Sequence, residues 1–384
     1  MSISKACLLR HLYEDELLLL EEMEEKTALI WEGNYWDGVC HDYAELSWST
    51  VAVVVAKIAK ILQKYCEKKD KVLILLPNII QLPLIVLAAE RLQLISILVD
   101  PSCPQKENTL IDLFNETTIK LIITVDGFWQ GDHLHQTKQN IDRILSENSL
   151  CVNNMIVIRH CAANDGIPPP EIEFPGRRPS YQLKLLLTEG RDEEWSQLFR
   201  KISDSTHDVV DFFHKLKEDD DEQADDRIIA ILADRKANAL NMEMVSQAQL
   251  TSSLENLKNI ELKNNFPEQM VILAVGHPSK SLFNFISTFY PWYTGNTLVQ
   301  YEGHVSFPDP SRISHIIKKY KVETLLISSD VSLDPNYLSI VPTSSLLNVV
   351  VGGSDDVDND FQTQLQLQIL KSAFHKIIIE TISL

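Results

Sequence analysis

The segment KVLILLPNIIQLPLIVLAAERLQLISILV, residues 71–99, decides the fold class of this chain. It is apolar enough to resemble a membrane span, but two prolines and a Glu-Arg pair interrupt it. We predict a strand at 71–76, a helix at about 78–93 and a second strand at 94–99. A strand, a helix and a second strand in this order form a βαβ unit, whose parallel strands are buried on both faces.

The rest of the chain continues this alternation of strands and helices. Helical periodicity covers 49–64, a further strand is predicted at 120–125, and a helix is predicted at 135–146. A second set of elements follows: strands at 228–232, 270–275, 297–301 and 322–327, and helices at about 245–259, 280–290 and 311–320. The predicted fold class is therefore α/β, with two similar α/β subdomains that have parallel-rich sheets.

The composition between these two sets indicates a connection. Residues 162–182 are rich in proline, and the run EDDDEQADD at 218–226 is typical of a solvated acidic loop. We therefore divide the chain into an N-terminal segment plus first α/β subdomain at 1–150, an irregular Pro-rich and acidic connection at 151–226, and a second α/β subdomain at 227–384.

The bulk composition limits the classes of partner and compartment. Lys and Arg total 35 against 54 Asp and Glu, a formal net charge of -19, which disfavours nucleic acid and anionic membranes as partners. The six cysteines form no CxxC pair, and the N-terminus lacks the pattern of a signal or transit peptide. We expect reduced thiols and a cytoplasmic protein, with the nucleus as the alternative compartment.

Five strings in this chain occur in the order of a known family. They are CLLRH (7–11), ALIWEGN (28–34), ITVDGFWQGDHL (123–134), YEGHVSFPDPSRISHIIKKYKVE (301–323) and SSLLNVVVGGSDD (344–356). Together they resemble the AMP-forming acetyl-CoA synthetases (acetate–CoA ligases) of the adenylate-forming acyl-CoA synthetase superfamily. The resemblance implies a truncated N-terminal domain of these enzymes, without their small C-terminal catalytic domain. The family reaction converts acetate, ATP and CoA to acetyl-CoA, AMP and pyrophosphate, with Mg as a cofactor.

The resemblance places the family's ATP phosphate loop, which is rich in Ser, Thr and Gly, on residues 233–242. The segment ILADRKANALNME (231–243) contains none of these three residue types, so it lacks the small and hydroxyl residues with which the family loop surrounds phosphates. The degenerate phosphate-loop positions are Ala233, Asp234, Arg235, Lys236, Asn238, Asn241 and Met242. Arg235 and Lys236 could contact phosphate by themselves, but we favour solvated charges on a strand-to-helix turn.

The remaining ligand positions implied by the resemblance have also changed. The family holds the phosphates of CoA with an Arg-Gly-(Gly/Glu)-Lys string, which here reads Gln130, Gly131, Asp132, His133 and lacks the guanidinium. At the family's nucleotide turn only Gly353 is kept. The HxH pair formed by His133 and His135 has no third ligand at a zinc spacing, so we predict no metal site.

These observations predict an acetyl-CoA synthetase-like protein that is catalytically inactive, a pseudoenzyme with no catalytic residues and no tightly bound cofactor. We expect a regulatory or scaffold role, with an intact acyl-CoA synthetase paralogue or another protein as the partner. Two alternatives stay open from the sequence: an active short-chain acyl-CoA ligase with an altered site, and a gene-model fragment with no stable product.

Overall fold

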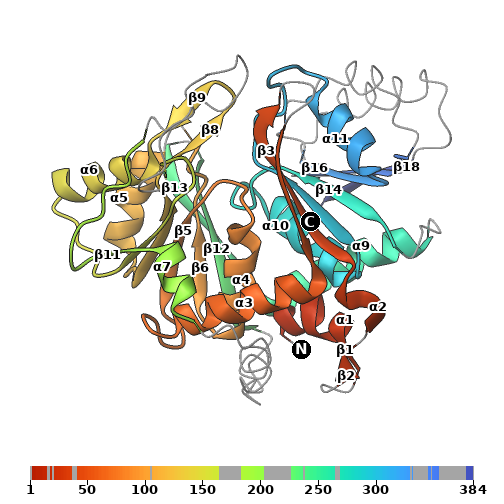
Figure 1. Cartoon of the computed structure of the whole chain (residues 1–384), viewed down its shortest axis with the longest axis horizontal. Helices are drawn as coiled ribbons and strands as arrows, with labels where there is room; N and C mark the ends of the chain where they lie inside the picture. The colour runs from red at the N-terminus through yellow and green to blue at the C-terminus, as the bar shows by residue number, and fades with distance from the viewer. Residues whose placement is uncertain are drawn as a thin grey trace.

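The computed structural model describes most of the chain, and all structural statements below refer to the described part. That part comprises residues 2–14, 18–19, 21–36, 41–103, 106–163, 183–202, 226–236, 238–263, 269–328, 331, 345–346, 348–353 and 378–383. Its centre consists of two seven-stranded sheets, with helices between them and on their outer faces (Figure 1).

The first sheet is parallel except for one edge strand. Its strands, in spatial order, are β11 (Asp192–Glu194), β10 (Met155–Ile158), β7 (Leu121–Val125), β5 (Lys71–Leu75), β6 (Ile95–Leu98), β12 (Ile228–Lys236) and β13 (Ala239–Ser246). Only the pair β12 and β13 is antiparallel. The predicted βαβ unit forms β5, α4 (Gln81–Arg91) and β6.

The second sheet has the same plan. Its strands, in spatial order, are β18 (Ile378–Ser383), β17 (Asn348–Gly353), β16 (Thr324–Ser328), β14 (Val271–Val275), β15 (Thr297–Tyr301), β3 (Thr27–Trp36) and β4 (His41–Ser47). Only β3 and β4 pair antiparallel. The two parallel-rich sheets confirm the predicted α/β fold class.

The helices form three layers around the sheets. The residues of the largest apolar cluster come from the facing sides of both sheets and from α3 (Trp48–Leu62), α4, α7 (Trp195–Arg200), α9 (Gln247–Lys263) and α10 (Leu282–Tyr293). The helices α5 (Lys106–Glu116) and α6 (Thr137–Glu147) cover the outer face of the first sheet, and α11 (Arg312–Tyr320) covers the outer face of the second (Figure 1). Short elements complete the described part: η1 (Lys5–Leu9), α1 (Arg10–Leu12), β1 (Tyr13–Glu14), β2 (Leu18–Leu19), α2 (Glu21–Glu24), and the hairpin of β8 (Phe128–Gln130) and β9 (His133–His135).

Strand β5 shows why the apolar segment at 71–99 folds in this way. Val72 and Ile74 face the helices between the sheets, whereas Leu73 and Leu75 face the cluster under α5 and α6. All four side chains are at most 1% exposed. Burying each such side chain stabilises the fold by about 1.5–3 kcal/mol. A strand covered on both faces therefore requires an almost continuous apolar run.

Two sequence-based expectations differ from the structure. The strand predicted at 228–232 continues to Lys236 and returns as β13, so the predicted strand-to-helix turn is wrong. The boundary drawn at residue 227 does not follow the sheets, because β12 and β13 belong to the first sheet while β3 belongs to the second. In the described part of the chain, no helix has both the length and the apolar character needed to cross a membrane.

Candidate functional site

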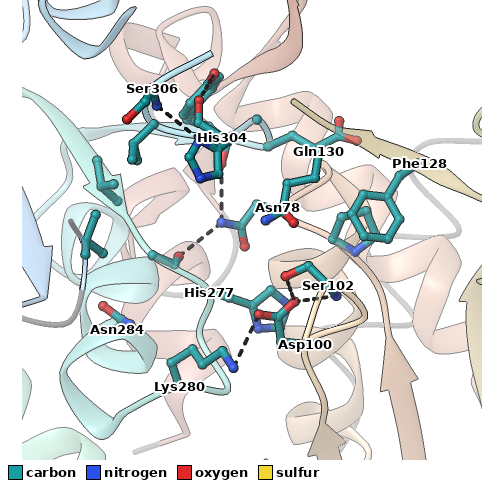
Figure 2. Close-up of a pocket in the computed structure, with 18 residues that line it drawn as sticks. Asn78, Asp100, Ser102, Phe128, Gln130, His277, Lys280, Asn284, His304 and Ser306 are labelled. Carbon is teal, nitrogen blue, oxygen red and sulfur yellow. Dashed lines mark hydrogen bonds and ion pairs between the residues drawn. The ribbon is translucent and has the colours of Figure 1, made fainter. Parts of the chain in front are cut away.

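A cavity of about 520 Å³ lies between the two sheets, where parallel strands of both end (Figure 2). Pro77 and Asp100 follow strands of the first sheet, and Gly276 and Glu302 follow strands of the second. We call this cavity the inter-sheet pocket; it is lined by Pro77, Asn78, Asp100, Ser102, Phe128, Gln130, Val275, Gly276, His277, Lys280, Asn284, Tyr301, Glu302, Gly303, His304, Val305, Ser306 and Val331. The carboxyl ends of parallel strands are the usual place for ligand sites in α/β proteins.

The ammonium group of Lys280 is paired with carboxylates. Its Nζ lies 3.6 Å from Oδ2 of Asp100 and 3.5 Å from Oδ1 of Asp234, and Figure 2 shows the side chain reaching toward Asp100. Burial opposes a charge on this group, but Asp100 and Asp234 hold the pKa of Lys280 above its ordinary value. The cation is thus neutralised within the protein.

The Asp100 carboxylate is held in its ionised form. Its Oδ1 accepts hydrogen bonds from the backbone N–H of Ser102 at 2.8 Å and from the Ser102 hydroxyl at 2.6 Å. Burial raises the pKa of Asp100, but the ammonium of Lys280 and the Ser102 donors hold it below the ordinary value. This charge therefore stays in the pocket near neutral pH.

His277 connects the two sheets as a neutral imidazole. Its Nε2 lies 2.9 Å from the carbonyl oxygen of Leu76, and its Nδ1 lies 2.8 Å from the Ser279 hydroxyl. Because a carbonyl can only accept, Nε2 carries the proton and Nδ1 accepts. Burial lowers the pKa of His277 below its ordinary value, which is consistent with the neutral form.

The side-chain amide of Asn284 has no hydrogen-bond partner among the described residues. Asn284 lies in the first turn of α10, and its side chain is 3% exposed. Both Oδ1 and Nδ2 are buried and unpaired within the described part of the chain. Buried polar groups are nearly always satisfied, and one without a partner costs about 1–3 kcal/mol. The amide is thus a buried polar group that the described residues leave unsatisfied.

Two more buried acceptor atoms of the pocket are unpaired in the described structure. The Nδ2 group of Asn78 donates to the carbonyl oxygens of Gly276 at 3.0 Å and Tyr301 at 3.3 Å, which leaves Oδ1 without a donor. Glu302 holds His160 through Oε1 at 2.7 Å, and its Oε2 has no described partner. The two oxygens belong to residues that follow strands of different sheets, and both are buried.

Sequence reasoning missed these pocket residues. The stretch 275–290 matches the family strings only with gaps, so no residue in it was assigned a role. A usable signal was present, since polar residues follow three predicted strands directly, in VDPS (99–102), VGHPSK (275–280) and YEGH (301–304). Their shared position at strand ends predicts a common edge once the sheet is known to be parallel.

The predicted phosphate-loop positions form a regular hairpin instead of a loop. Ala233 pairs with Met242, Asp234 with Asn241, and Lys236 with Ala239, so only residues 237 and 238 connect the strands. Ala233 is 2% exposed and belongs to the core under α5, and Met242 packs against the same core.

Asn238 has a φ of +64°, the left-handed conformation that asparagine tolerates in two-residue turns. Of the degenerate loop positions, the structure brings Asp234 near the pocket, through Lys280.

Arg235 is engaged in structure rather than free. Its Nη1 pairs with Oδ2 of Asp112 on α5, and its Nη2 donates to the carbonyl oxygen of Asn238. The side chain is 11% exposed, whereas Lys236 is exposed. The expectation of solvated charges is therefore wrong for Arg235.

The predicted CoA positions divide between the pocket and the surface. Gln130 lines the inter-sheet pocket, and His133 is exposed. The backbone of Gly131, which has a φ of +63°, is bound by Asn34 of the second sheet: Gly131 N–H donates to Oδ1 and Asn34 Nδ2 donates to the Gly131 carbonyl, both at 2.8 Å. Asn34 thus occupies the backbone groups that a phosphate would need.

The remaining predicted positions lie apart from the pocket. Gly353 ends β17, pairs with Ser383, and does not belong to the described lining. Of the HxH pair, His135 stacks on Phe128 with ring centroids 4.6 Å apart, and burial lowers its pKa to about 4. No group of three or more His, Cys, Asp or Glu side chains suited to a metal ion occurs in the described residues.

The residues present do not fit ATP, Mg or CoA in the way the resemblance implies. Two carboxylates and one ammonium line the pocket, and that ammonium is already paired. A triphosphate or the phosphates of CoA would meet excess negative charge here. The hairpin at 233–242 leaves no loop whose N–H groups could surround phosphates.

Comparisons with known proteins agree with this fold. A model of the family of AMP-binding enzymes matches residues 20–182. An uncharacterized protein of Caenorhabditis elegans is 38% identical over 123 residues, which are 30% of this chain and 82% of that protein. The acetyl-coenzyme A synthetase of Leptospira biflexa serovar Patoc is 30% identical over 161 residues, 41% of this chain and 22% of the synthetase.

A solved structure matches the whole chain. The acetoacetyl-CoA synthetase from Streptomyces lividans superposes with a TM-score of 0.71 at 15% identity, covering 100% of this chain and 52% of that one. The chain therefore spans about half the length of this structural relative, and the likeness concerns the fold. Together with the sequence matches, it supports the resemblance of this chain to the adenylate-forming superfamily, with the family model matching less than half of the chain.

Proposed function

We propose that this protein is a non-catalytic, acetyl-CoA synthetase-like protein that acts through binding. The observation that carries the proposal is the hairpin of β12 and β13. At the place of the family's phosphate loop, paired strands run from 233 to 242 with two residues between them, and Arg235 is held by Asp112. In such a ladder the N–H groups that face the partner strand are used in pairing, and the two strands leave no loop of N–H groups that could surround a phosphate.

The charges of the inter-sheet pocket support the same proposal. Hydrogen bonds to charged groups contribute about 1.5–3 kcal/mol each, so losing three of them weakens binding by roughly 5 kcal/mol, or several thousand-fold. The Lys280 ammonium is already paired with Asp100 and Asp234 and offers an anionic ligand little attraction, while the Glu302 carboxylate repels it. The lost hydrogen bonds and the charges of the pocket both disfavour the use of ATP and CoA.

A regulatory role with an intact acyl-CoA synthetase in the cytoplasm follows as part of the proposal. The chain keeps a family scaffold in which β13 forms one edge of the first sheet, with Met244 on it 58% exposed. An edge strand offers unpaired backbone groups to a second chain, so this edge is a natural contact site.

Pyrophosphate release with Mg-ATP, CoA and either acetate or propionate tests the proposal. We expect no release above the buffer rate from this protein alone, with an intact acetyl-CoA synthetase as the positive control. Turnover by this protein would contradict the proposal and favour a short-chain acyl-CoA ligase with an altered site. For the partner, we expect co-elution with the intact synthetase or a change in the kcat of that synthetase. The absence of both effects would contradict the regulatory role.

A further inference from the structure

We propose that the outer edge of β4 is a docking site for an extended acidic peptide segment, which adds a strand to the second sheet beside the lysines of α11. This inference goes beyond the non-catalytic role proposed above, because it concerns an edge of the other sheet and holds whether or not β13 contacts a synthetase. It rests on the unpaired side of β4, on its exposed aromatic residue and on the charges of α11.

Strand β4 forms one edge of the second sheet. It is seven residues long and pairs with β3 on one side, and in the described residues no strand pairs with its other side. An unpaired edge offers backbone N–H and C=O groups to an extended peptide. Tyr43 lies on this strand and is 54% exposed. The edge therefore combines free backbone groups with an aromatic side chain that a partner can cover.

The face of β4 that carries Tyr43 lies beside lysines of α11. The rings of His41 and Tyr43 stack with their centroids 4.5 Å apart, and Nζ of Lys319 lies 4.7 Å from the centroid of the Tyr43 ring. Lys318 precedes Lys319 in the last turn of α11, and Lys321 follows this helix. Both are exposed, and neither has an ion pair within the described part of the chain. This side of the second sheet is therefore basic.

The ammonium of Lys319 is only partly neutralised. Its Nζ lies 3.1 Å from Oε2 of Glu32, but the other oxygen of this carboxylate pairs with Arg312. One carboxylate thus serves two cations, and the Lys319 side chain is 33% exposed. At physiological ionic strength the Debye length is about 8 Å, so these local cations, rather than the net charge of -19, determine which partner is attracted.

An acidic strand fits this edge better than a second copy of the chain. Pairing of β4 with its own copy about a two-fold axis would bring the same lysines together, and like charges disfavour such an interface. In an extended peptide, every second side chain points to the same face of the sheet. A segment with Asp or Glu at alternate positions would therefore place its carboxylates on the side of α11.

Fluorescence anisotropy with labelled peptides of the length of β4 tests the proposal. One peptide alternates Thr and Glu, and a second alternates Thr and Lys. A third keeps the Glu residues but has prolines at the central Thr positions, which removes N–H groups that a strand needs. We expect saturable binding of the Thr-Glu peptide, at least about tenfold tighter than that of the other two. Equal binding of either control peptide, tighter binding of inorganic polyphosphate, or no saturation at millimolar peptide would contradict the proposal.

Hydrogen exchange followed by mass spectrometry locates the bound peptide. The Thr-Glu peptide should protect backbone amides of β4 and leave those of β13, the antiparallel edge strand of the first sheet, unchanged. Protection of β13 instead of β4 would contradict the assignment of the site.

Variants separate the contribution of charge from that of the aromatic residue. Lys319→Gln should weaken the Thr-Glu peptide by about tenfold, whereas Lys319→Arg should retain binding. Lys184→Gln, at an exposed lysine outside the second sheet, is the matched control. Tyr43→Ala should also weaken the peptide by about tenfold, and Met244→Ala, the exposed apolar residue of β13, should not.

Two outcomes with these variants would overturn the proposal. The first is peptide binding that Lys319→Gln and Tyr43→Ala both leave unchanged while circular dichroism shows that both variants are folded. The second is a dimer of the unliganded protein in sedimentation that Tyr43→Ala dissociates, because it would place a second copy on the edge of β4.

Discussion

Each of the two sheets ends in an antiparallel hairpin, and the two hairpins differ in what they hold. On β3, Glu32 is fully buried and contacts Arg312, Tyr320 and Lys319 of α11, the last at 3.1 Å. On β12, Arg235 makes an ion pair with Asp112, whose side chain is 37% exposed. The first hairpin contains a buried charge cluster that joins three elements, and the second is a plain ladder with a two-residue turn.

The difference between the two hairpins explains which segments of this chain resemble the family. Two of the family strings, ALIWEGN at 28–34 and the long string at 301–323, meet in space at Glu32 and Arg312. Removing one member of a buried charge cluster leaves the others unpaired at a high cost, so such residues cannot change singly. Residues that contact only a ligand carry no such cost. The scaffold strings therefore resemble the family, while the segment 233–242 forms an ordinary hairpin.

Breaking the buried cluster gives the largest expected effect. Glu32→Gln should lower the free energy of unfolding by about 3–5 kcal/mol, because it leaves the Arg312 guanidinium, 1% exposed, without its carboxylate. Urea denaturation followed by circular dichroism measures the loss. The matched control is Glu107→Gln, whose partner Arg143 is exposed, and it should leave stability nearly unchanged. Equal effects of the two variants would contradict the contrast between a buried cluster and a surface pair.

Acid should lower the stability of the fold to a smaller extent. Burial lowers the pKa of His135, beside the pocket, to about 4 from 6.5, so between these values the unfolded chain binds more protons than the folded one. Stability is therefore lost as the pH falls from about 6.5 toward about 4. His11, whose pKa burial also lowers to about 4, adds to the same slope. His135→Gln should reduce the decline in melting temperature over this range, and an unchanged decline would contradict the assignment.

Substitutions in the turn between β12 and β13 should have the smallest effect on stability. Asn238→Ala should cost about 1 kcal/mol, because its φ of +64° is strained for alanine, whereas Asn238→Gly should be nearly neutral. Denaturant titration of the two variants side by side measures the difference. If alanine is tolerated as well as glycine, the strands are not joined by a tight turn, and an open loop at 233–242 becomes the better description.

Much of the fold was predictable because its strands are buried on both faces. The continuous apolar runs at β5, β14 and β15 are unambiguous, and their predicted bounds agree with the structure within one or two residues. β13 was missed although ALNMEM alternates, with Leu240 and Met242 on the core side. The charged run before it, residues 234–236, has the composition of a strand end. That β12 continues through these residues depends on pairing with β13, which sequence position does not reveal.

The candidate site was less predictable, since its members come together only in the tertiary structure. Asn78, Asn284 and Glu302 are far apart in the chain: Asn78 follows β5, Asn284 lies in α10, and Glu302 follows β15. Asn284 sits in the apolar segment LFNFISTFYPWY, where helical spacing gives no hint of an unpaired amide. Gln130 was singled out for CoA and does line the pocket, but its neighbour Gly131 is bound by Asn34, a contact between residues nearly a hundred positions apart.

The most direct test of the central claim, a family scaffold whose phosphate loop has become a hairpin, is calorimetric titration of the protein with Mg-ATP. We predict no saturable heat at millimolar nucleotide, because the segment 233–242 pairs as two strands instead of forming a loop of N–H groups around phosphates, and Arg235 is held by Asp112. Saturable binding that Arg235→Gln abolishes would contradict the account, since it would show that this segment still binds phosphate.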